Sequence, residues 1–342
     1  MVDIILIGFG AVGQGLVEIL RDRGGDLAAA YGFHARVVAV ATRSRGSLAH
    51  PDGLDPARLL QAAPGGLDQY PDAPGLRRGL EALTLIREVA ADVLVEASPT
   101  RLPDGQPALD YCRAALASGK HVVLANKGPL VAAYRDLHDR AARAGRHLAF
   151  EGTVMAGTPA LRLAQSALAG CRISEARGIL NGTTNYILTR MEAGLDYAAA
   201  LAEAQALGYA EADPSADVDG WDAAAKLLIL ARVLFGVEPG LADLDVTGIT
   251  GITPDAIAAA QAAGERWKLV ARITPAGGSV APARVPLSDP LAAAAGATNA
   301  VTYVTDLLGP VTLVGSGAGR LSTGFALLSD LLAIHRLEAA GR

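Results

Sequence analysis

The pattern of apolar positions divides the chain near residue 150. Before that point, short apolar runs alternate with longer stretches in which apolar residues recur at helical spacing. The runs that predict strands are 3–7, 36–41, 92–97, 121–125 and 147–150, and helices are expected between them, as at 108–117 and 130–144. Strands separated by helices of this length favour parallel pairing with right-handed crossovers. The first part of the chain is therefore expected to be an α/β domain with a doubly wound parallel sheet.

The regular alternation stops after Phe150. Residues 151–159 are expected to form a loop that leads into a helix begun by Pro159. A strand is then expected at 173–180, followed by helices at 186–192, 221–235 and 321–337. A chain of 342 residues is long enough for two domains that share an interface, and the change of pattern favours a boundary near residue 150.

Composition excludes several classes of function. The net charge of -5 and the pI near 5.7 come with no block of basic residues, so nucleic-acid binding is not expected. No apolar run reaches the roughly 20 residues that span a bilayer, and the N-terminus lacks a basic leader, so a cytoplasmic protein is expected. Cys112 and Cys171 are too few for a disulfide framework. The six histidines are scattered without metal-ligand spacing, so none is assigned to zinc.

A glycine-rich motif follows the first predicted strand. Residues 8–13 read Gly-Phe-Gly-Ala-Val-Gly and open a predicted helix, which is the context of a dinucleotide-binding loop. Gly8 would make the tight turn, Gly10 would admit the pyrophosphate, and Gly13 would let helix and strand pack closely. A plain tight turn is the alternative. The loop residues predicted to bind cofactor are Gly8, Phe9, Gly10, Ala11, Val12 and Gly13.

The end of the second predicted strand favours NADP over NAD. An NAD-selective site carries an acidic residue there for the ribose 2′-hydroxyl, but Ala41 is followed by Thr-Arg-Ser-Arg. Arg43 and Arg45 with two hydroxyls suit a 2′-phosphate, although NAD stays possible. The alternative is that these arginines face water, which is as good an interpretation for Arg45 and a weaker one for Arg43.

Lysine is rare in this chain. Among thirty basic residues, the lysines are Lys120, Lys127, Lys226 and Lys268. Lysine can exchange its proton at usable pH whereas arginine cannot, so a retained lysine is a candidate for chemistry. Lys127 ends an apolar strand, and Lys226 follows an acidic stretch. Coding bias with chance survivors is the alternative.

The acidic stretch and the helix after it hold a second candidate group. Asp222 and Lys226 stand at positions i and i+4 of the predicted helix 221–235 and so share one face. Spacing alone favours a surface ion pair, but the mostly apolar helix suggests partial burial.

In Asn-Gly-Thr-Thr-Asn at 181–185, helix capping is as good an interpretation as ligand contact for Thr184 and Asn185. Gly182 and Thr183 are the better ligand candidates.

Six segments taken together resemble homoserine dehydrogenase, in order and over essentially the whole chain. They are 8–13, 125–130, 151–159, 178–185, 208–214 and 222–226. The resemblance implies a Rossmann domain at 1–150, a smaller α+β substrate-binding and dimerisation domain at 151–304, and a C-terminal segment at 305–342 that returns to the first domain. It implies a cytoplasmic homodimer that interconverts L-homoserine and L-aspartate 4-semialdehyde with NAD(P), in threonine and methionine biosynthesis. The chain is similar to the short form, without a fused aspartate kinase or a C-terminal domain that senses threonine.

The resemblance also implies roles for single residues. The catalytic residues would be Lys226, Asp222 and Lys127, with Lys127 near nicotinamide as well. The substrate would be held by Glu211, Tyr209, Gly182, Thr183 and Asp217. Ser98, Ala125 and Gly319 would contact the cofactor, beside the glycine loop. A monovalent cation, Na⁺ or K⁺, would be bound by Glu151, Val154, Ala156 and Thr158. Met155-Ala156 and Ser316 depart from the commoner family pattern, where glycines and a proline are usual.

The implied reaction is hydride transfer to the aldehyde carbon, with Lys226 giving a proton to the carbonyl oxygen. Two other classes of function remain. A lysine in an apolar site can form a Schiff base with an aldehyde, which would make the protein a lyase. A cofactor-sensing binding protein without turnover is the second alternative.

Overall fold

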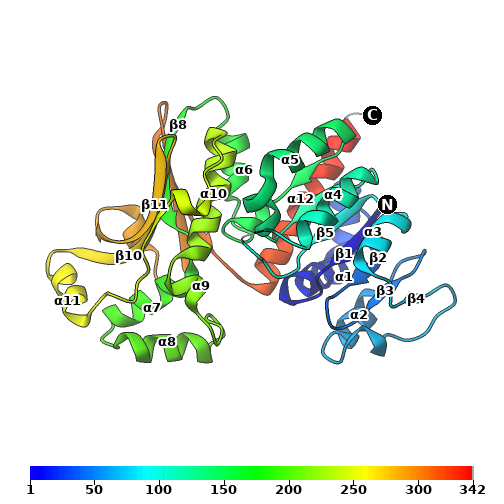
Figure 1. The fold of residues 1–342 in the computed structure, drawn as a ribbon, viewed down its shortest axis with the longest axis horizontal. Coiled ribbons are helices and arrows are strands. Elements are labelled where there is room, and N and C mark those ends of the chain that lie inside the picture. The colour runs from blue at the N-terminus through cyan, green and yellow to red at the C-terminus, as the bar shows by residue number, and fades with distance from the viewer. Residues whose placement is uncertain (103, 341–342) are drawn as a thin grey trace. The chain divides into compact units, whose positions relative to one another are not determined.

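The chain forms two compact units in the computed structural model, which describes residues 1–102 and 104–340 (Figure 1). Unit 1 comprises Met1–Gly157 and Gly319–Arg342, and unit 2 comprises Thr158–Ala318. The division differs from the boundaries expected at 150 and 304. Residues 305–318 belong to unit 2 because they complete a hairpin of its sheet. The last two residues of the expected C-terminal segment, 341 and 342, lie outside the described residues.

Unit 1 is built on a seven-stranded sheet in the order β4-β3-β2-β1-β5-β6-β7. Five strands are parallel: β1 (Val2–Ile7), β2 (Ala35–Ala41), β5 (Val93–Glu96), β6 (His121–Leu124) and β7 (Leu148–Ala149). The antiparallel strands β3 (Ser47–Ala49) and β4 (Arg77–Arg78), of which β4 is the edge strand, were not expected, since two or three residues carry no readable periodicity. The predicted doubly wound parallel sheet is confirmed. The strand order reverses beside β1, and ligands of such sheets bind at the carboxyl ends of strands at this point.

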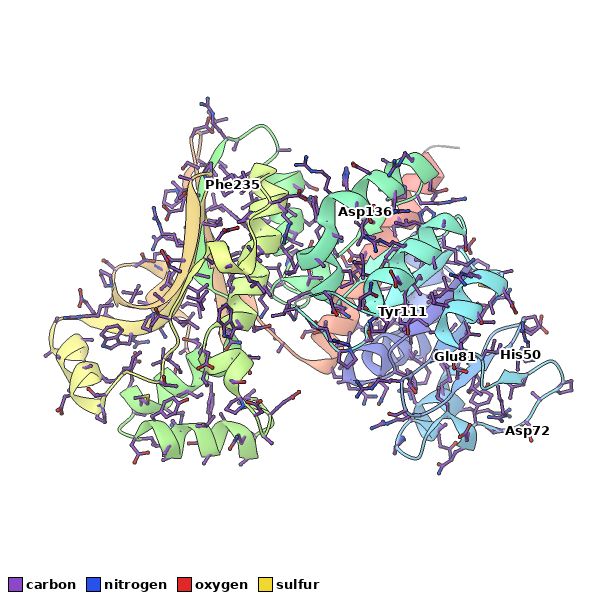
Figure 2. All side chains as sticks on the ribbon, viewed as in Figure 1. His50, Asp72, Glu81, Tyr111, Asp136 and Phe235 are labelled. Atoms are coloured by element: carbon purple, nitrogen blue, oxygen red, sulfur yellow. The ribbon has the colours of Figure 1, made fainter. Side chains whose placement is uncertain are left out.

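The helices of unit 1 fall into two groups that pack among themselves. One group contains α1 (Ala11–Tyr31), α2 (Pro56–Ala62) and α12 (Arg320–Ala340), and the other contains α3 (Ala82–Glu88), α4 (Ala108–Ala117) and α5 (Gly128–Ala144). Asp136 of α5 (labelled in Figure 2) accepts a hydrogen bond from Nε of Arg113 on α4 at 2.9 Å. Apolar side chains of α1, α12 and the sheet form one core, which includes Ile4, Leu16, Val95, Val123 and Leu327.

Unit 2 is built on a six-stranded sheet in the order β13-β12-β8-β10-β11-β9. Its strands are β8 (Ile173–Ile179), β9 (Asp245–Val246), β10 (Glu265–Thr274), β11 (Gly277–Pro286), β12 (Thr298–Thr305) and β13 (Gly309–Ser316), and only the β9–β11 pairing is parallel. Its helices are α6 (Ala160–Arg162), α7 (Gly182–Glu192), α8 (Tyr197–Ala206), α9 (Ser215–Val218), α10 (Trp221–Phe235) and α11 (Pro254–Ala262). The helix expected at 221–235 is confirmed as α10. The helix expected at 186–192 begins four residues earlier, at Gly182.

Candidate active site

The glycine loop between β1 and α1 has the geometry that its sequence predicts. Gly8 has a φ of 93°, and a Cβ there would lie 2.5 Å from the Ala97 carbonyl group. A Cβ on Gly13 would lie 2.3 Å from the Gly8 carbonyl oxygen. Both glycines are therefore needed for the turn and for the close approach of α1 to the sheet. Gly10 differs from them, because a Cβ there meets nothing within 4 Å.

The exposed side of this loop can receive an anion. Gly10 is the N-cap of α1 and Ala11 is its first residue, and both are exposed, whereas Phe9 is buried in the core. Val12 is half-buried. The amides of the first helical turn lack partners within the helix, and the helix dipole favours negative charge at this end. The open space over Gly10 thus fits the pyrophosphate of a dinucleotide.

The carboxyl ends of β5 and β6 bring further predicted cofactor residues together. Nδ2 of Asn126 donates to Oγ of Ser98 at 3.3 Å, and the backbone N–H of Lys127 donates to Oγ1 of Thr100 at 3.3 Å. Ala125 precedes them and is half-buried. Asn126 was not predicted from sequence. It also caps the next helix, since its Oδ1 accepts the N–H of Gly128 at 2.9 Å.

The two arginines in the segment after β2 differ in their contacts. Nη1 of Arg45 donates to the Ala63 carbonyl oxygen at 3.1 Å, which gives this guanidinium a structural role. Oγ1 of Thr42 accepts the Arg45 N–H at 2.8 Å and donates to the Gly46 carbonyl at 3.0 Å, so it braces the turn. Arg43 and Ser44 are exposed beside the strand end. Arg43 is thus the better placed of the two arginines for a ligand.

The residues expected to bind a cation lie in a loop tied to α12. The N–H of Glu151 donates to Oδ2 of Asp330 at 2.9 Å, and both residues are buried. Met155 and Ala156 have φ values of 58° and 49°, a left-handed conformation in which glycine is favoured. Val154 is buried beside them. Thr158 is the first residue of unit 2, and its hydroxyl donates to the Ser316 carbonyl at 3.0 Å.

The end of β8 in unit 2 holds a buried charged group around Lys226. Nζ of Lys226 donates to Oδ2 of Asp222 at 2.7 Å and to the Leu180 carbonyl oxygen at 2.6 Å. Lys226 is 8% exposed. A solvated surface ion pair, which the spacing alone favoured, is therefore the wrong interpretation: the lysine is enclosed, and a backbone carbonyl shares it with the carboxylate.

Asn181 links this pair to a second carboxylate. Its Nδ2 donates to Oδ1 of Asp217 at 2.6 Å and to Oδ2 of Asp222 at 2.9 Å. Burial first, and then repulsion from Asp222, raises the pKa of Asp217. Asn181 is also the N-cap of α7, because its Oδ1 accepts the N–H of Thr184 at 2.8 Å. The cap predicted at Thr184 or Asn185 is therefore corrected to Asn181.

The predicted substrate residues are only partly brought together. Oγ1 of Thr183 donates to the Tyr209 carbonyl at 2.7 Å, and the ring of Tyr209 lies 4.9 Å from that of Tyr186. Gly182 begins α7, and a Cβ there would lie 2.8 Å from the Ala297 carbonyl oxygen. Glu211 is exposed in the loop before α9, where its carbonyl accepts a hydrogen bond from Gln205.

Two buried charged residues were missed by the sequence analysis. Glu96 at the end of β5 is fully buried, and burial raises its pKa to about 7. Within the described part of the chain its Oε2 has no hydrogen-bond partner, while Oε1 accepts the Ser98 N–H at 3.1 Å. Lys268 of β10 donates to Oδ1 of Asn185 and to the Ala294 carbonyl, and burial lowers its pKa to about 8. Neither residue stands in a motif. The rarity of lysine drew attention to Lys268 but assigned it no role, and Glu96 had no signal at all.

Two of the histidines that are scattered in sequence meet in unit 1. Nε2 of His121 and Nε2 of His147 lie 3.6 Å and 3.5 Å from Oε1 of Glu338 on α12. Three such groups resemble a metal site. However, Nδ1 of His121 accepts the His147 N–H at 3.0 Å, so neutral His121 carries its proton on Nε2 and offers no lone pair there. Burial lowers the pKa of His121, which favours this neutral form.

Comparison with known proteins identifies both units. The profile described as "Homoserine dehydrogenase, NAD binding domain" matches residues 8–151, and that described as "Homoserine dehydrogenase" matches 159–332. An NAD(+)-dependent homoserine dehydrogenase of Pseudomonas canavaninivorans is 42% identical, over 97% of this chain and 95% of the relative. A homoserine dehydrogenase of Methanocaldococcus jannaschii is 41% identical, over 97% of this chain and 98% of the relative.

Solved structures agree with this assignment. The crystal structure of a putative homoserine dehydrogenase from Archaeoglobus fulgidus has a TM-score of 0.87 and 40% identity, and covers 98% of this chain and 99% of its own. A hyperthermophilic archaeal homoserine dehydrogenase in complex with NADPH has a TM-score of 0.84 and 28% identity, with 98% of both chains covered. In the described part of the chain, no helix is long and apolar enough to cross a membrane. The chain therefore belongs to the homoserine dehydrogenase family of NAD(P)-dependent oxidoreductases.

Proposed function

We propose that this protein interconverts L-aspartate 4-semialdehyde and L-homoserine with NADP, in threonine and methionine biosynthesis, and that Lys226 is its proton donor and acceptor. The observation that carries the proposal is the pair of hydrogen bonds from Nζ of Lys226, to Asp222 at 2.7 Å and to the Leu180 carbonyl at 2.6 Å. These two acceptors fix the direction of the ammonium group. Its third hydrogen is then available to a carbonyl oxygen of the substrate.

The chemistry of this lysine follows from its surroundings. During reduction of the aldehyde, negative charge develops on the carbonyl oxygen, and the Lys226 ammonium neutralises it by giving up a proton. During oxidation of the alcohol, neutral Lys226 takes the hydroxyl proton. Asp222 holds the amine in place in both directions and stabilises its charged form, while Asn181 holds Asp222. Arginine could not replace this lysine, because it does not release its proton at usable pH.

The cofactor belongs to the glycine loop of unit 1. Bound nicotinamide supplies or accepts the hydride. The residues that would hold the dinucleotide are those of the loop at 8–13, with Ser98, Ala125, Lys127 and Gly319. The exposed guanidinium of Arg43 supports a preference for NADP, since no carboxylate stands at the end of β2. One relative is named NAD(+)-dependent and another was solved with NADPH, so the preference needs a direct measurement.

The substrate and the cation would be bound by further residues. Glu211, with its exposed carboxylate, would bind the ammonium group of the amino acid, next to Tyr209, Thr183, Gly182 and Asp217. A monovalent cation would be held by Glu151 and the carbonyls of Val154 and Ala156, and the left-handed conformation of Met155 and Ala156 supports a built loop there. The residue expected to add to them, Thr158, lies in unit 2. We also propose a cytoplasmic homodimer.

One assay separates this proposal from its alternatives. Reduced nicotinamide absorbance is followed with aspartate semialdehyde and with NADPH and NADH side by side. We expect turnover with both and a higher kcat/KM with NADPH. Binding of NADPH without turnover would make the protein a cofactor-sensing binding protein. Covalent trapping of the aldehyde on Lys226 by borohydride, without consumption of NADPH, would support the Schiff-base lyase.

A further inference from the structure

The start of α12 is bonded to the helix that follows the glycine loop. Nε of Arg320 donates to Oε2 of Glu18 at 2.9 Å, and its Nη1 donates to Oε1 of Gln14 at 3.0 Å. Nε2 of Gln14 in turn donates to the carbonyl oxygen of Phe9 at 2.9 Å. The amide oxygen of Gln14 accepts the hydrogen bond from the Arg320 guanidinium, so the amide NH₂ of Gln14 is directed toward the loop. Arg320, Gln14 and the Phe9 carbonyl thus form a relay of hydrogen bonds from α12 to the peptide bond between Phe9 and Gly10.

The relay controls the direction of an amide at the anion site. The peptide unit is planar and trans, so the carbonyl of Phe9 and the N–H of Gly10 point in opposite directions. A hydrogen bond that holds the Phe9 carbonyl therefore also sets the Gly10 N–H. Gly10 is the N-cap of α1, at the end of the helix where anions bind. Without the relay, this peptide unit is freer to rotate, because glycine tolerates most backbone conformations.

Direct backbone contact between α1 and α12 keeps the relay in register. A Cβ on Gly15 would lie 2.1 Å from the Arg320 carbonyl oxygen, and a Cβ on Gly324 would lie 2.6 Å from the Gly15 carbonyl carbon. The two helices thus cross at these glycines, within one turn of Arg320. Gln14 and Glu18 are four residues apart on α1 and lie on one face, where the two donor arms of Arg320 reach both.

We propose that Arg320 is a positioning residue for the dinucleotide, acting through Gln14 on the Phe9–Gly10 peptide unit. The proposal rests on cofactor binding at the glycine loop. It assigns to the C-terminal helix a part in cofactor affinity that is separate from its packing. Since the pyrophosphate is common to both dinucleotides, the contribution is the same for NADP and NAD.

The test compares two arginines of α12. Arg320→Met removes the relay, whereas Arg336→Met removes another arginine contact between the same helices, because the Arg336 guanidinium lies 5.2 Å from the centre of the Tyr31 ring. Dissociation constants for NADP and NAD are measured by calorimetry, together with Tm. We expect Arg320→Met to weaken both dinucleotides by about three- to tenfold. We expect Arg336→Met to leave both constants within twofold of wild type.

Gln14 provides the second arm of the experiment. Gln14→Met should weaken the dinucleotides as much as Arg320→Met, and the double variant should be no weaker than either single one, because both break one relay. The Gln14→Met variant also tests the relay if Arg320→Met does not fold. Unchanged dissociation constants in Arg320→Met, equal losses in Arg336→Met, or additive losses in the double variant would overturn the proposal. Wild-type protein that binds no dinucleotide would instead contradict the proposed function.

Discussion

The proposed sites of the two units are built from different chemical groups, backbone in one unit and side chains in the other. In unit 1 the proposed cofactor site is made of backbone: Gly8 and Gly13 leave no room for a side chain, and a Cβ on Gly10 would meet nothing within 4 Å. In unit 2 the proposed catalytic site is made of side chains, with Lys226, Asp222 and Asn181 joined by hydrogen bonds in a largely buried group. A backbone site suits a cofactor that many enzymes share, because amides bind phosphate whatever it carries. A cluster of charged side chains suits proton transfer, which needs a titratable group.

Replacing either of two loop glycines by alanine should disturb the proposed site of unit 1, and the two variants should do so in different ways. Gly13→Ala places a Cβ 2.3 Å from the Gly8 carbonyl oxygen, so we expect the free energy of unfolding to fall by on the order of 3 kcal/mol. In Gly10→Ala the added Cβ has no atom within 4 Å, so this variant should keep the stability of the wild type. It should nevertheless lose dinucleotide affinity. Thermal unfolding and calorimetric titration of both variants make the comparison. Equal stability losses in the two would contradict the roles assigned to these glycines.

Glu96 is one of the buried titratable side chains of unit 1, and its effect should appear in stability. Its pKa in the folded protein is about 7, above the ordinary 4.5, so the native state holds an extra proton between these values. The free energy of unfolding should therefore fall as pH rises through this window, by on the order of 3 kcal/mol. Glu96→Gln stays neutral and should remove this fall.

Urea unfolding across the window, with the exposed Glu81→Gln as control (Glu81 is labelled in Figure 2), measures the effect of Glu96. The control should follow the wild type. If Glu96→Gln shows the same pH dependence as wild type, the Glu96 carboxyl does not carry the raised pKa.

The side-chain site of unit 2 should respond to the loss of a single charge. Glu211→Gln keeps the shape of the side chain but removes the charge that we assign to the substrate ammonium. We expect the KM for homoserine to rise by about tenfold or more, with NADP affinity unchanged. Asp219→Asn, another exposed residue of the acidic stretch, serves as the control and should change neither. A Tm that drops while KM stays constant would make Glu211 a structural residue.

The smallest effect is expected at the end of β2. Arg43→Ala should weaken NADP by about tenfold and leave NAD almost unchanged, since only NADP has the 2′-phosphate. Arg45→Ala is the matched control, because its guanidinium is held by the Ala63 carbonyl. Equal losses for both cofactors in Arg43→Ala, or a larger NADP loss in Arg45→Ala, would remove the assignment.

Elements that are set by local spacing could be predicted from the sequence, whereas contacts between distant residues could not. The glycine loop and the helices at 108–117 and 221–235 follow from local spacing, and the structure confirms these elements. The charged cluster joins Asn181, Asp217, Asp222 and Lys226 from separate elements, so spacing alone indicated only the i, i+4 pair, and Asp217 was expected only from the resemblance. Asn181 was missed because its role depends on tertiary contact. Glu96 and Lys268 were missed because burial is not written in any motif.

The central claim is that Lys226 moves the proton while unit 1 binds the cofactor independently of it. Lys226→Arg keeps the charge and the helix propensity but removes the group that releases a proton at usable pH. Its kcat for homoserine oxidation and its dissociation constant for NADP are measured together, with Tm as a check on folding. We predict that kcat falls by roughly 10²- to 10⁴-fold while the dissociation constant stays within twofold. A loss of kcat below about tenfold, with affinity and Tm preserved, would contradict the account.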